Sequence, residues 1–439
     1  MKILRLLPRF REVEKTVEKL NKARDWPRQK IEAIQLLQLN RVWSQAIQST
    51  EYYRNLKADY RLPDQFDSLE EFQNKVPILN KEKVRDQPES FLSSKSTGGR
   101  WHRTGGSTGK PTSVFWAKDA HLRNLRLRYA WLSAHGVDYL APNAMLWGHA
   151  ASVAPGPKGH FAKLRRPIED RLRNRQRFSA YHLTDETFER YLNCLCKRKT
   201  EMLYGYSSAI LMLARFAATT DRAADLSLKL VVLTGEPTSP ADSEFISRTL
   251  GCPAKIEYGS TECGNLAYEY QNGILEVQDS LRIIETLPRN TAEMSAPAFD
   301  IIVTVLDNPS FPLLRYTIGD TTSQPVERPE IGFSRLVDVT GRSNDYLVSG
   351  DGVFVHANVV KHVIECFPAI VRFQAHQHAD GSIKVSYEQD KFSAPPDVVA
   401  IKSTLRRYLG DVLIQFVAVD RIKGNLAAKH RWVISDYHS

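Results

Sequence analysis

Apolar residues recur at helical spacing over the first 50 residues of the chain. Steps of three or four residues place such side chains on one face of a helix. Between residues 10 and 50 these positions are Val13, Val17, Leu20, Ile31, Ile34, Leu37, Leu39, Trp43 and Ile47. The pattern predicts a helical lead-in, within residues 1–60, that packs on a larger body.

The middle of the chain alternates short apolar runs with helical patterns. The runs predict strands at residues 144–147, 228–233 and 254–258, and the periodic segments predict helices at 119–132, 184–199, 207–218 and 241–250. Asp119 is expected to be the N-cap of the first of these helices, because its carboxylate can accept a first-turn N–H. Strands and helices in alternation favour an α/β architecture of stacked layers.

From residue 275 onward the pattern changes to short strands separated by turns. Strands are expected at residues 283–284, 301–306 and 313–316. Residues 371–376 and 382–387 flank Ala379-Asp380-Gly381, which predicts a hairpin, and a helix at 396–409 and a strand at 412–419 follow. We expect a large domain over residues 1–342 and a small α+β domain over residues 343–439.

Composition narrows the class of protein. The 439 residues include 42% apolar residues, and no apolar run approaches the ~18–20 residues that cross a bilayer. The five cysteines form no CxxC pair, which favours reduced thiols over a disulfide framework. The first nine residues contain too short an apolar segment for a secretory signal. We therefore expect a cytoplasmic protein without membrane insertion.

The net charge of +10 raises the question of a nucleic-acid partner. Basic residues gather locally at 163–177, where either a phosphate-rich partner or a solvated helix face explains them. The chain contains no helix-turn-helix, zinc-finger or RNP signature. The charge thus favours an anionic substrate or an acidic partner over specific nucleic-acid binding.

A glycine-rich segment supplies the first candidate for chemistry. It consists of Thr104, Gly105, Gly106, Ser107, Thr108, Gly109 and Lys110. Its N–H groups can surround a phosphate, but Pro111 after the lysine departs from a Walker A loop. Because residues 112–116 predict a strand, the segment is expected to connect two strands. A plain glycine turn is the alternative on composition alone.

Four further motifs follow in order, and each taken alone also fits a surface turn or a basic tail. They are Tyr258-Gly259-Ser260-Thr261-Glu262, Leu314-Arg315-Tyr316-Thr317-Ile318-Gly319-Asp320, Gly341-Arg342-Ser343-Asn344-Asp345 and Ala427-Ala428-Lys429-His430-Arg431. A carboxylate such as Glu262 suits Mg²⁺, which takes oxygen ligands. Gly319 is expected to form a tight turn that presents Asp320 to a ribose diol.

In this order the five motifs resemble the adenylate-forming superfamily, and most closely its branch of phenylacetate–CoA ligase-like and CapK-like proteins. The resemblance covers nearly the whole chain. It extends to Tyr52-Tyr53-Arg54, to Leu203-Tyr204-Gly205-Tyr206-Ser207-Ser208, to Gly235-Glu236-Pro237 and to the C-terminal 429–435. It implies a large N-terminal domain of layered sheets and helices and a small C-terminal lid.

The resemblance also implies roles for individual residues. Residues 104–110 would grip the phosphates of ATP, and Lys429, entering from the small domain, would bridge the carboxylate and the α-phosphate. Thr261 would bond the α-phosphate and Glu262 would hold Mg²⁺. The nucleotide site would further include Gly235, Glu236, Tyr258, Gly259, Ser260, Asp320 and Arg342, with Asp345 at the hinge and His149, Tyr206 and Ser207 near the acyl group.

The activity that the resemblance implies is formation of an acyl-adenylate from a small carboxylic acid, followed by acyl transfer. Coenzyme A is the default acceptor, and an amine, a hydroxyl or a carrier-protein thiol is the alternative. A non-catalytic nucleotide-binding relative is a further alternative, and the oligomeric state is left as monomer or homodimer.

The sequence departs from the family pattern at two places in the C-terminal part. Ala427-Ala428 stands where the family often has Gly-Gly, and the proline common after the hinge glycines is absent from 353–358.

Overall fold

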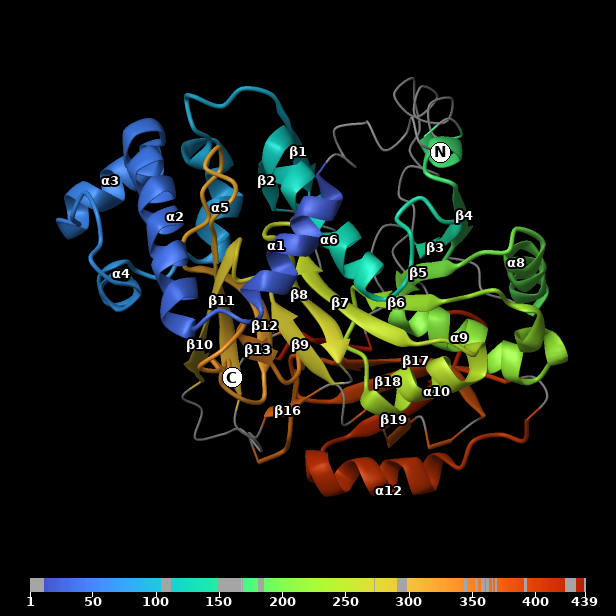
Figure 1. Ribbon diagram of the computed structural model, residues 1–439. Coiled ribbons are helices and arrows are strands. Elements are labelled where there is room, and N and C mark those ends of the chain that lie inside the picture. Colours follow the sequence, from blue (N-terminus) through green and yellow to red (C-terminus); the bar gives the residue numbers. More distant parts are fainter. Residues whose placement is uncertain are drawn as a thin grey trace. The chain divides into compact units, whose positions relative to one another are not determined.

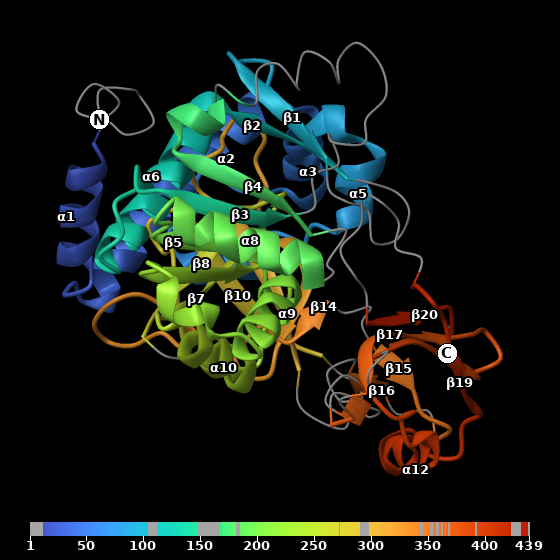
Figure 2. The same cartoon turned by 90° about the vertical axis from the view of Figure 1, so that its right-hand side faces the viewer.

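The structure is a computed structural model that describes residues 12–437, with gaps. The gaps are residues 104–111, 148–166, 168, 181–184, 272, 290–297, 343–345, 352–353, 357–359, 361–362, 365, 368, 391–392 and 423–431. Figures 1 and 2 show the arrangement of the elements in two views.

Helices and strands alternate through the middle of the chain, as the sequence predicts. The helices are α1 (Val13–Ala23), α2 (Arg28–Ser49), α3 (Glu51–Tyr60), α4 (Leu69–Lys75), α5 (Lys81–Asp86), α6 (Lys118–Ala134), α8 (Asp185–Lys197), α9 (Ser207–Ala218), α10 (Pro240–Leu250) and α12 (Val398–Leu409), with 3₁₀ turns η2 (Pro88–Phe91) and η4 (Asp221–Asp225). The first strands are β1 (Gly99–Arg103), β2 (Ser113–Ala117), β3 (Asn143–Trp147), β4 (Arg175–Ser179), β5 (Met202–Tyr206), β6 (Leu230–Thr234), β7 (Ala254–Ser260), β8 (Gly264–Gln271), β9 (Ile274–Val277) and β10 (Arg282–Pro288). The remaining strands are β11 (Phe299–Val305), β12 (Tyr316–Thr322), β13 (Arg335–Leu336), β14 (Gly341–Arg342), β15 (Tyr346–Val348), β16 (Phe354–His356), β17 (Ile370–Gln377), β18 (Ile383–Gln389), β19 (Ile414–Ala418) and β20 (Val433–Ser435).

An eight-stranded sheet forms the centre of the larger part of the chain. Its order is β13-β9-β8-β7-β6-β5-β3-β4, with β4, β3, β5, β6 and β7 parallel and β8, β9 and β13 antiparallel. Along β6, Val231 and Leu233 pack with α8, α9 and α10, whereas Leu230 and Val232 pack with α1 and α6. Figures 1 and 2 show these helices on opposite sides of the sheet. Because both faces are covered, β6 is apolar along nearly its whole length.

The described contacts divide the chain into two compact units. The first unit comprises Met1–Glu285, Ile302–Ile318 and Val326–Asp338, and the second comprises Thr286–Ile301, Gly319–Pro325 and Val339–Ser439. The four-stranded sheet β10-β11-β12-β14 includes strands whose residues are divided between the two units. The division at residues 342 and 343 stays a prediction of the sequence.

The second unit is built on a small mixed sheet. The strand order is β19-β18-β17-β20, in which β17 and β18 form an antiparallel hairpin and β19 and β20 pair in parallel at its edges. Gly381 in the hairpin turn takes a φ of 82°, which glycine adopts without steric cost. Ile401, Leu405 and Leu409 of α12 pack against this sheet. The predicted α+β hairpin, helix and strand are thus confirmed.

Two local expectations were wrong. Helix α6 begins at Lys118, and Ala117 rather than Asp119 is its N-cap, because β2 leads directly into the helix. The strand predicted at 313–316 begins three residues later, as β12. Arg315 has a φ of 49°, which interrupts extended backbone just before β12. Asp320 and the preceding glycine therefore lie within a strand and not in a tight turn.

Candidate active site

Three parallel strands end side by side at one edge of the large sheet. Tyr206 ends β5, Gly235 and Glu236 follow β6, and Gly259 and Ser260 end β7. The carboxyl ends of parallel strands are where α/β proteins place their ligand sites. The fold thus brings together the predicted residues of three separate motifs in the first unit.

Glu236 joins the loop after β6 to the start of α9. Its Oε2 accepts a hydrogen bond of 2.9 Å from the backbone N–H of Ser208, one of the first helical N–H groups. Thr238 donates from its hydroxyl to Oγ of Ser207 at 2.6 Å. Gly235 has a φ of 79°, which allows the sharp turn out of β6. The Glu236 carboxylate therefore caps a helix, and its place in a nucleotide site stays a prediction.

An aromatic stack lies at the same edge. The rings of Trp147 and Tyr206 are 4.0 Å apart at an interplanar angle of 25°, and Tyr204 stacks on Trp147 at 5.5 Å and 15°. Arg128 of α6 lies 4.1 Å over the Tyr204 ring, a distance typical of a cation–π contact. The stack includes Tyr206 and is followed in the chain by Ser207, and these two residues are predicted to lie near the acyl group. His149 lies outside the described residues.

A buried ion pair supports the strand that carries Tyr258. Arg128 Nε lies 2.9 Å from Oε2 of Glu257, and the Tyr204 hydroxyl donates to Glu257 Oε1 at 3.2 Å. Burial raises the pKa of Glu257, while the positive charge of Arg128 opposes the rise. Tyr258 itself is buried at the next position of β7. The pair thus ties β5, β7 and α6 together directly beside the predicted adenine contact.

The turn after β7 carries Thr261 and Glu262, and its backbone is held from several sides. The Trp116 Nε1–H donates to the carbonyl of Thr261 at 3.0 Å, and the N–H of Cys263 donates to Ser260 Oγ at 2.9 Å. Gly264 closes the turn with a φ of 71°, and a Cβ there would lie 2.6 Å from Oδ1 of Asn124. Both observations require glycine at this position.

Arg282 contacts this turn from the protein interior, and its exposed fraction is 0%. Its Nε donates to the carbonyl of Cys263 at 2.8 Å, and its two terminal nitrogens donate to Asp307 Oδ1 at 2.6 Å and to Asn124 Oδ1 at 2.7 Å. A guanidinium offers five N–H groups in a fixed plane, so it can orient several acceptors at once. Arg282 therefore sets the position of the backbone next to Glu262.

Glu262 is 5% exposed and is paired with a lysine that sequence reasoning missed. Lys81 Nζ of α5 donates to Glu262 Oε1 at 2.7 Å. Burial, and secondly the charge of Glu262, raises the pKa of the nearby Tyr316 hydroxyl well above its usual range. Glu262 offers the oxygen donors that Mg²⁺ takes, and the ammonium group shows that a cation is stable at this carboxylate. The carboxylate is of the chemical type that the metal role needs, one of its oxygens already bonds Lys81, and the metal role of Glu262 stays a prediction.

Asp320 and Arg342 are backbone neighbours in the second unit. They lie opposite each other in the antiparallel pair of β12 and β14, and Asp320 is half-buried. Opposed residues of two such strands project from the same face. Only the backbone of Arg342 is described, so the ribose contact of the pair stays a prediction.

The remaining predicted residues fall outside the described part of the chain. They are Thr104 to Lys110, Asp345 and Lys429. The antiparallel pairing of Arg103 in β1 with Ser113 in β2 confirms that the glycine-rich segment connects two strands. Its contact with phosphate is untested.

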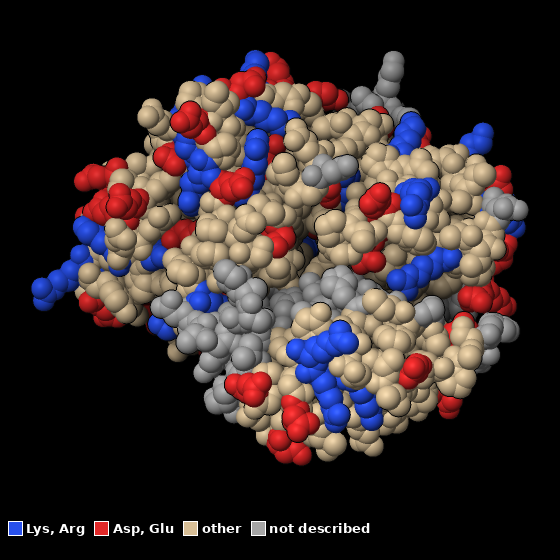
Figure 3. Space-filling view, turned by 90° about the horizontal axis from the view of Figure 1, so that it is seen from below, with Lys and Arg blue, Asp and Glu red and all other residues tan. Residues whose placement is uncertain are grey.

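The described end of the basic run at 163–177 is partly helix and partly strand, and Arg171, within the helical residues 169–172, is exposed. Arg175 and Arg177 lie in β4, where Arg177 pairs with Asp170 at 2.8 Å. Burial lowers the pKa of Arg175 to about 10, and its Nε donates to Asn143 Oδ1 at 3.1 Å. On the face in Figure 3, the described Lys and Arg side chains form separate clusters among Asp and Glu. Within the described residues no helix has the length and apolar character needed to cross a membrane.

This fold is that of the adenylate-forming enzymes, as the comparison with solved structures shows. A 2-hydroxyisobutyryl-CoA ligase in the postadenylation state matches with a TM-score of 0.71 and 18% identity, covering 94% of this chain and 92% of the other. An acyl acid amido synthetase in complex with 2,4-DB matches with a TM-score of 0.59 and 14% identity, covering 92% of this chain and 89% of the other. The predicted fold class and resemblance are confirmed.

Two curated proteins are similar in sequence. Protein CapK of Staphylococcus aureus is 26% identical over 297 residues, which cover 65% of this chain and 62% of CapK. Phenylacetate-coenzyme A ligase of Thermus thermophilus is 25% identical over 367 residues, which cover 79% of this chain and 77% of the ligase. The chain thus matches less than two thirds of the length of CapK. No protein-family model matches the chain.

Proposed function

We propose that the chain is an ATP-dependent, AMP-forming ligase. It would convert a carboxylic acid and ATP into an acyl-adenylate and pyrophosphate, and then transfer the acyl group to a nucleophile. The observation that carries the proposal is the turn after β7 at the carboxyl edge of the parallel sheet. Hydrogen bonds fix the backbone of this turn, and its buried Glu262 carboxylate pairs with the ammonium group of Lys81. Similarity to a phenylacetate-coenzyme A ligase supports it.

The first step depends on positioning and on charge. The acid carboxylate attacks the α-phosphorus in line with the leaving pyrophosphate, and no covalent enzyme intermediate is needed. Residues 104–110 grip the β- and γ-phosphates, and Thr261 bonds the α-phosphate. Glu262 would hold Mg²⁺, which when bound would neutralise part of the phosphate charge. Lys429 stabilises the charge that develops on the reacting oxygens.

We assign the nucleoside to residues from four of the motifs. Tyr258 and the segment Gly235-Glu236 contact the adenine, and Gly259 and Ser260 allow the nucleotide to approach the backbone at the end of β7. The Asp320 carboxylate accepts hydrogen bonds from the two ribose hydroxyls, and Arg342 assists there as a donor. The acyl group lies against the stacked rings of Trp147 and Tyr206.

The acceptor is coenzyme A in our proposal. Similarity in sequence and fold to CoA ligases supports this choice, whereas the fold shared with an acyl acid amido synthetase favours an amine as the second candidate. Residues 343–439 act as a mobile lid that turns about Asp345, brings Lys429 in for the first step and removes it for the second. The chain works in the cytoplasm, as a monomer or a homodimer.

Pyrophosphate exchange tests the first step without knowledge of the acceptor. Labelled pyrophosphate is incubated with the full chain, ATP, MgCl₂ and a panel of aliphatic and aromatic carboxylic acids. We expect label to enter ATP only when a suitable acid and Mg²⁺ are both present. ATP binding without exchange for any acid would identify a non-catalytic nucleotide-binding protein instead.

Matched variants connect the exchange to the site. Glu262→Gln keeps the size of the side chain but removes its charge, and we expect exchange to fall about 10²–10³-fold. Glu186→Gln changes an exposed carboxylate in the first turn of α8 and should leave exchange unchanged. Equal activity of the two variants would remove Glu262 from the mechanism.

A further inference from the structure

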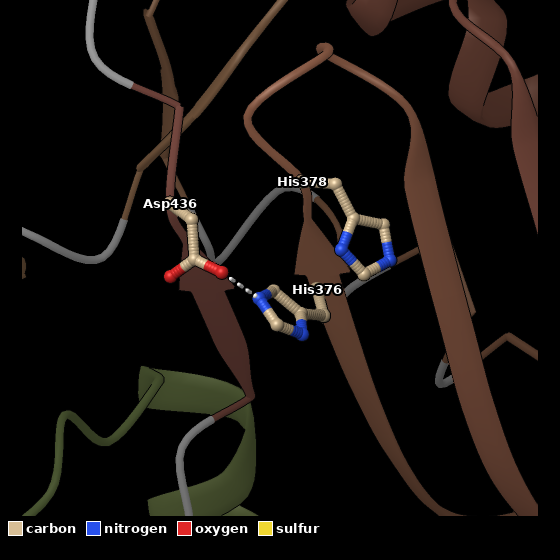
Figure 4. Close-up of side chains that lie close together, drawn as sticks. All are labelled: His376, His378 and Asp436. Carbon is tan, nitrogen blue, oxygen red and sulfur yellow. Dashed lines mark hydrogen bonds and ion pairs between the residues drawn. The ribbon is translucent and has the colours of Figure 1, made fainter.

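Two histidines and an aspartate come together in the second unit, and none of the three is among the residues assigned to the ligase reaction. His376 lies in β17, His378 directly after it, and Asp436 directly after β20. One ligand atom from each lies within 4.8 Å of the other two. Figure 4 shows His376 and Asp436 pointing toward each other, with the His378 ring beside them.

The backbone places these side chains on one face. Residues two apart in a strand project to the same side, so His376 and His378 share a face while Gln377 projects to the other. Strand β20 runs parallel to β17 with Ser435 opposite Gln377, and the N–H of Asp436 donates to the Gln377 carbonyl at 2.9 Å. The ladder therefore sets Asp436 next to the two imidazoles.

Gln377 makes this arrangement rigid. Its side chain is 1% exposed and its amide bonds both the N–H and the carbonyl of Val348, at 2.7 Å and 2.6 Å. The same side chain accepts a hydrogen bond of 3.2 Å from the Ser435 hydroxyl. The end of β17 is thus anchored to both β15 and β20, and the two histidine backbones are anchored with it.

The donor atoms fit a transition-metal ion. His376 Nε2 and Asp436 Oδ2 are 2.6 Å apart, and the centroids of the two imidazole rings are 4.5 Å apart. In a tetrahedral zinc site with bonds near 2.0 Å, donor atoms are about 3.3 Å apart. Small side-chain rotations would therefore be enough. Two imidazoles and one carboxylate suit Zn²⁺ or Co²⁺, whereas Mg²⁺ prefers oxygen ligands alone.

The site is open to solvent, and Lys384 of β18 lies opposite His376 in the hairpin. The side chains of His376 and Asp436 are 35% and 58% exposed, so an ion can reach them from solvent.

We propose that His376, His378 and Asp436 bind one divalent transition-metal ion, with Zn²⁺ as the ion that the donor set fits best. Three protein ligands leave the fourth position to water. The ion crosslinks the end of β17 to the segment after β20. Because the proposal uses none of the residues of the ligase reaction, it stands or falls independently of the proposed function.

Direct titration of the metal tests the site. The full chain, first treated with a chelator and then freed of it, is titrated with ZnCl₂ by calorimetry and with CoCl₂ by visible absorption, where tetrahedral Co²⁺ gives intense bands. We expect one equivalent of Zn²⁺ to bind, a tetrahedral Co²⁺ spectrum, and a higher midpoint of thermal unfolding with Zn²⁺. MgCl₂ at the same concentration should have no such effect.

Variants assign the ligands. His376→Ala, His378→Ala and Asp436→Asn should each weaken Zn²⁺ binding at least about tenfold and abolish the Co²⁺ bands. Asp411→Asn, at an exposed carboxylate of the same unit, should bind as the parent does. Circular dichroism confirms that each variant is folded, and Asp436→Asn is close in size to the parent.

Two results would overturn the proposal. Absence of Zn²⁺ binding to the chelator-treated parent would leave an ordinary exposed ion pair between His376 and Asp436. Zn²⁺ binding that the double variant His376→Ala/His378→Ala retains would place the ion elsewhere in the chain.

Discussion

Replacing Arg282 by methionine is expected to destabilise the first unit and to displace the turn that carries Thr261 and Glu262. Methionine has a similar length and no charge, so the substitution removes the hydrogen bonds with little change in volume. Four acceptors lose a donor: Asp307, Asn124 and the carbonyls of Leu281 and Cys263.

The magnitude follows from the burial of the pair. Arg282 and Asp307 have side chains 0% and 1% exposed, so the variant leaves an uncompensated buried carboxylate. Removing one partner of such a pair costs about 3–5 kcal/mol of unfolding free energy. The loss of unfolding free energy should lie in the lower half of this range, because Asn124 still donates to Asp307 Oδ2 at 2.7 Å. At about 2 °C per kcal/mol, the midpoint of thermal unfolding falls by roughly 6–8 °C.

Thermal unfolding is measured by calorimetry, and pyrophosphate exchange is measured in the same preparation at a temperature at which the variant is folded. Arg222→Met is the matched control, because Arg222 pairs with Glu189 at 2.7 Å while both side chains are about 40% exposed. Exposed pairs contribute about 0–1 kcal/mol, so this variant should unfold within about 2 °C of the parent.

A double variant separates the buried charge from the lost packing. Arg282→Met/Asp307→Leu removes both charges, and we expect it to be more stable than Arg282→Met alone. The reasoning is refuted if Arg282→Met unfolds as the parent does, or if the double variant is the less stable of the two. Normal exchange in a destabilised Arg282→Met would show that the residue stabilises the fold without positioning the turn.

Four further variants test the site. Lys429→Ala should lower pyrophosphate exchange about 10²–10³-fold while the dissociation constant of ATP stays within about threefold, because the lysine acts on the transition state. Asp320→Ala should instead weaken ATP binding, as measured by calorimetry, since a ribose contact is present in ground and transition states alike. Asp345→Pro should retain one half-reaction in separate assays and fail in the overall reaction, because proline restricts the rotation a hinge needs. Gly264→Ala should lower both the unfolding midpoint and exchange, because its φ of 71° and the 2.6 Å approach to Asn124 exclude a Cβ. The role tested is contradicted by parent-like exchange in Lys429→Ala or Gly264→Ala, by parent-like ATP binding in Asp320→Ala, or by a normal overall reaction in Asp345→Pro.

Much of the fold could be predicted from local pattern. The periodicity of residues 207–218 reproduces α9 with the bounds that the structure has, and the alternation around Gly381 reproduces the hairpin of β17 and β18. The strand at 313–316 was misplaced because Arg315 takes a left-handed conformation, where it pairs with Glu285 at 2.9 Å. Apolar alternation does not reveal a single residue of unusual φ.

The candidate site was only partly predictable. The motifs marked the strand ends because glycine, hydroxyl and carboxylate residues cluster there in sequence. The supporting residues lie outside the motif. Trp116 is 145 positions from Thr261, Arg282 is 19 positions from Cys263, and Lys81 is 181 positions from Glu262. Each looks like an ordinary surface or core residue until the tertiary structure brings it to the turn.

The way in which the turn after β7 is held has a consequence for evolution. Trp116 and Arg282 bond the main-chain carbonyls of Thr261 and Cys263, and every residue type at these positions has a carbonyl. Mutations that exchange the side chains at 261 and 262 would therefore leave those two bonds in place. Chemistry at the tip of the turn can diverge between descendants while its supporting framework is inherited unchanged.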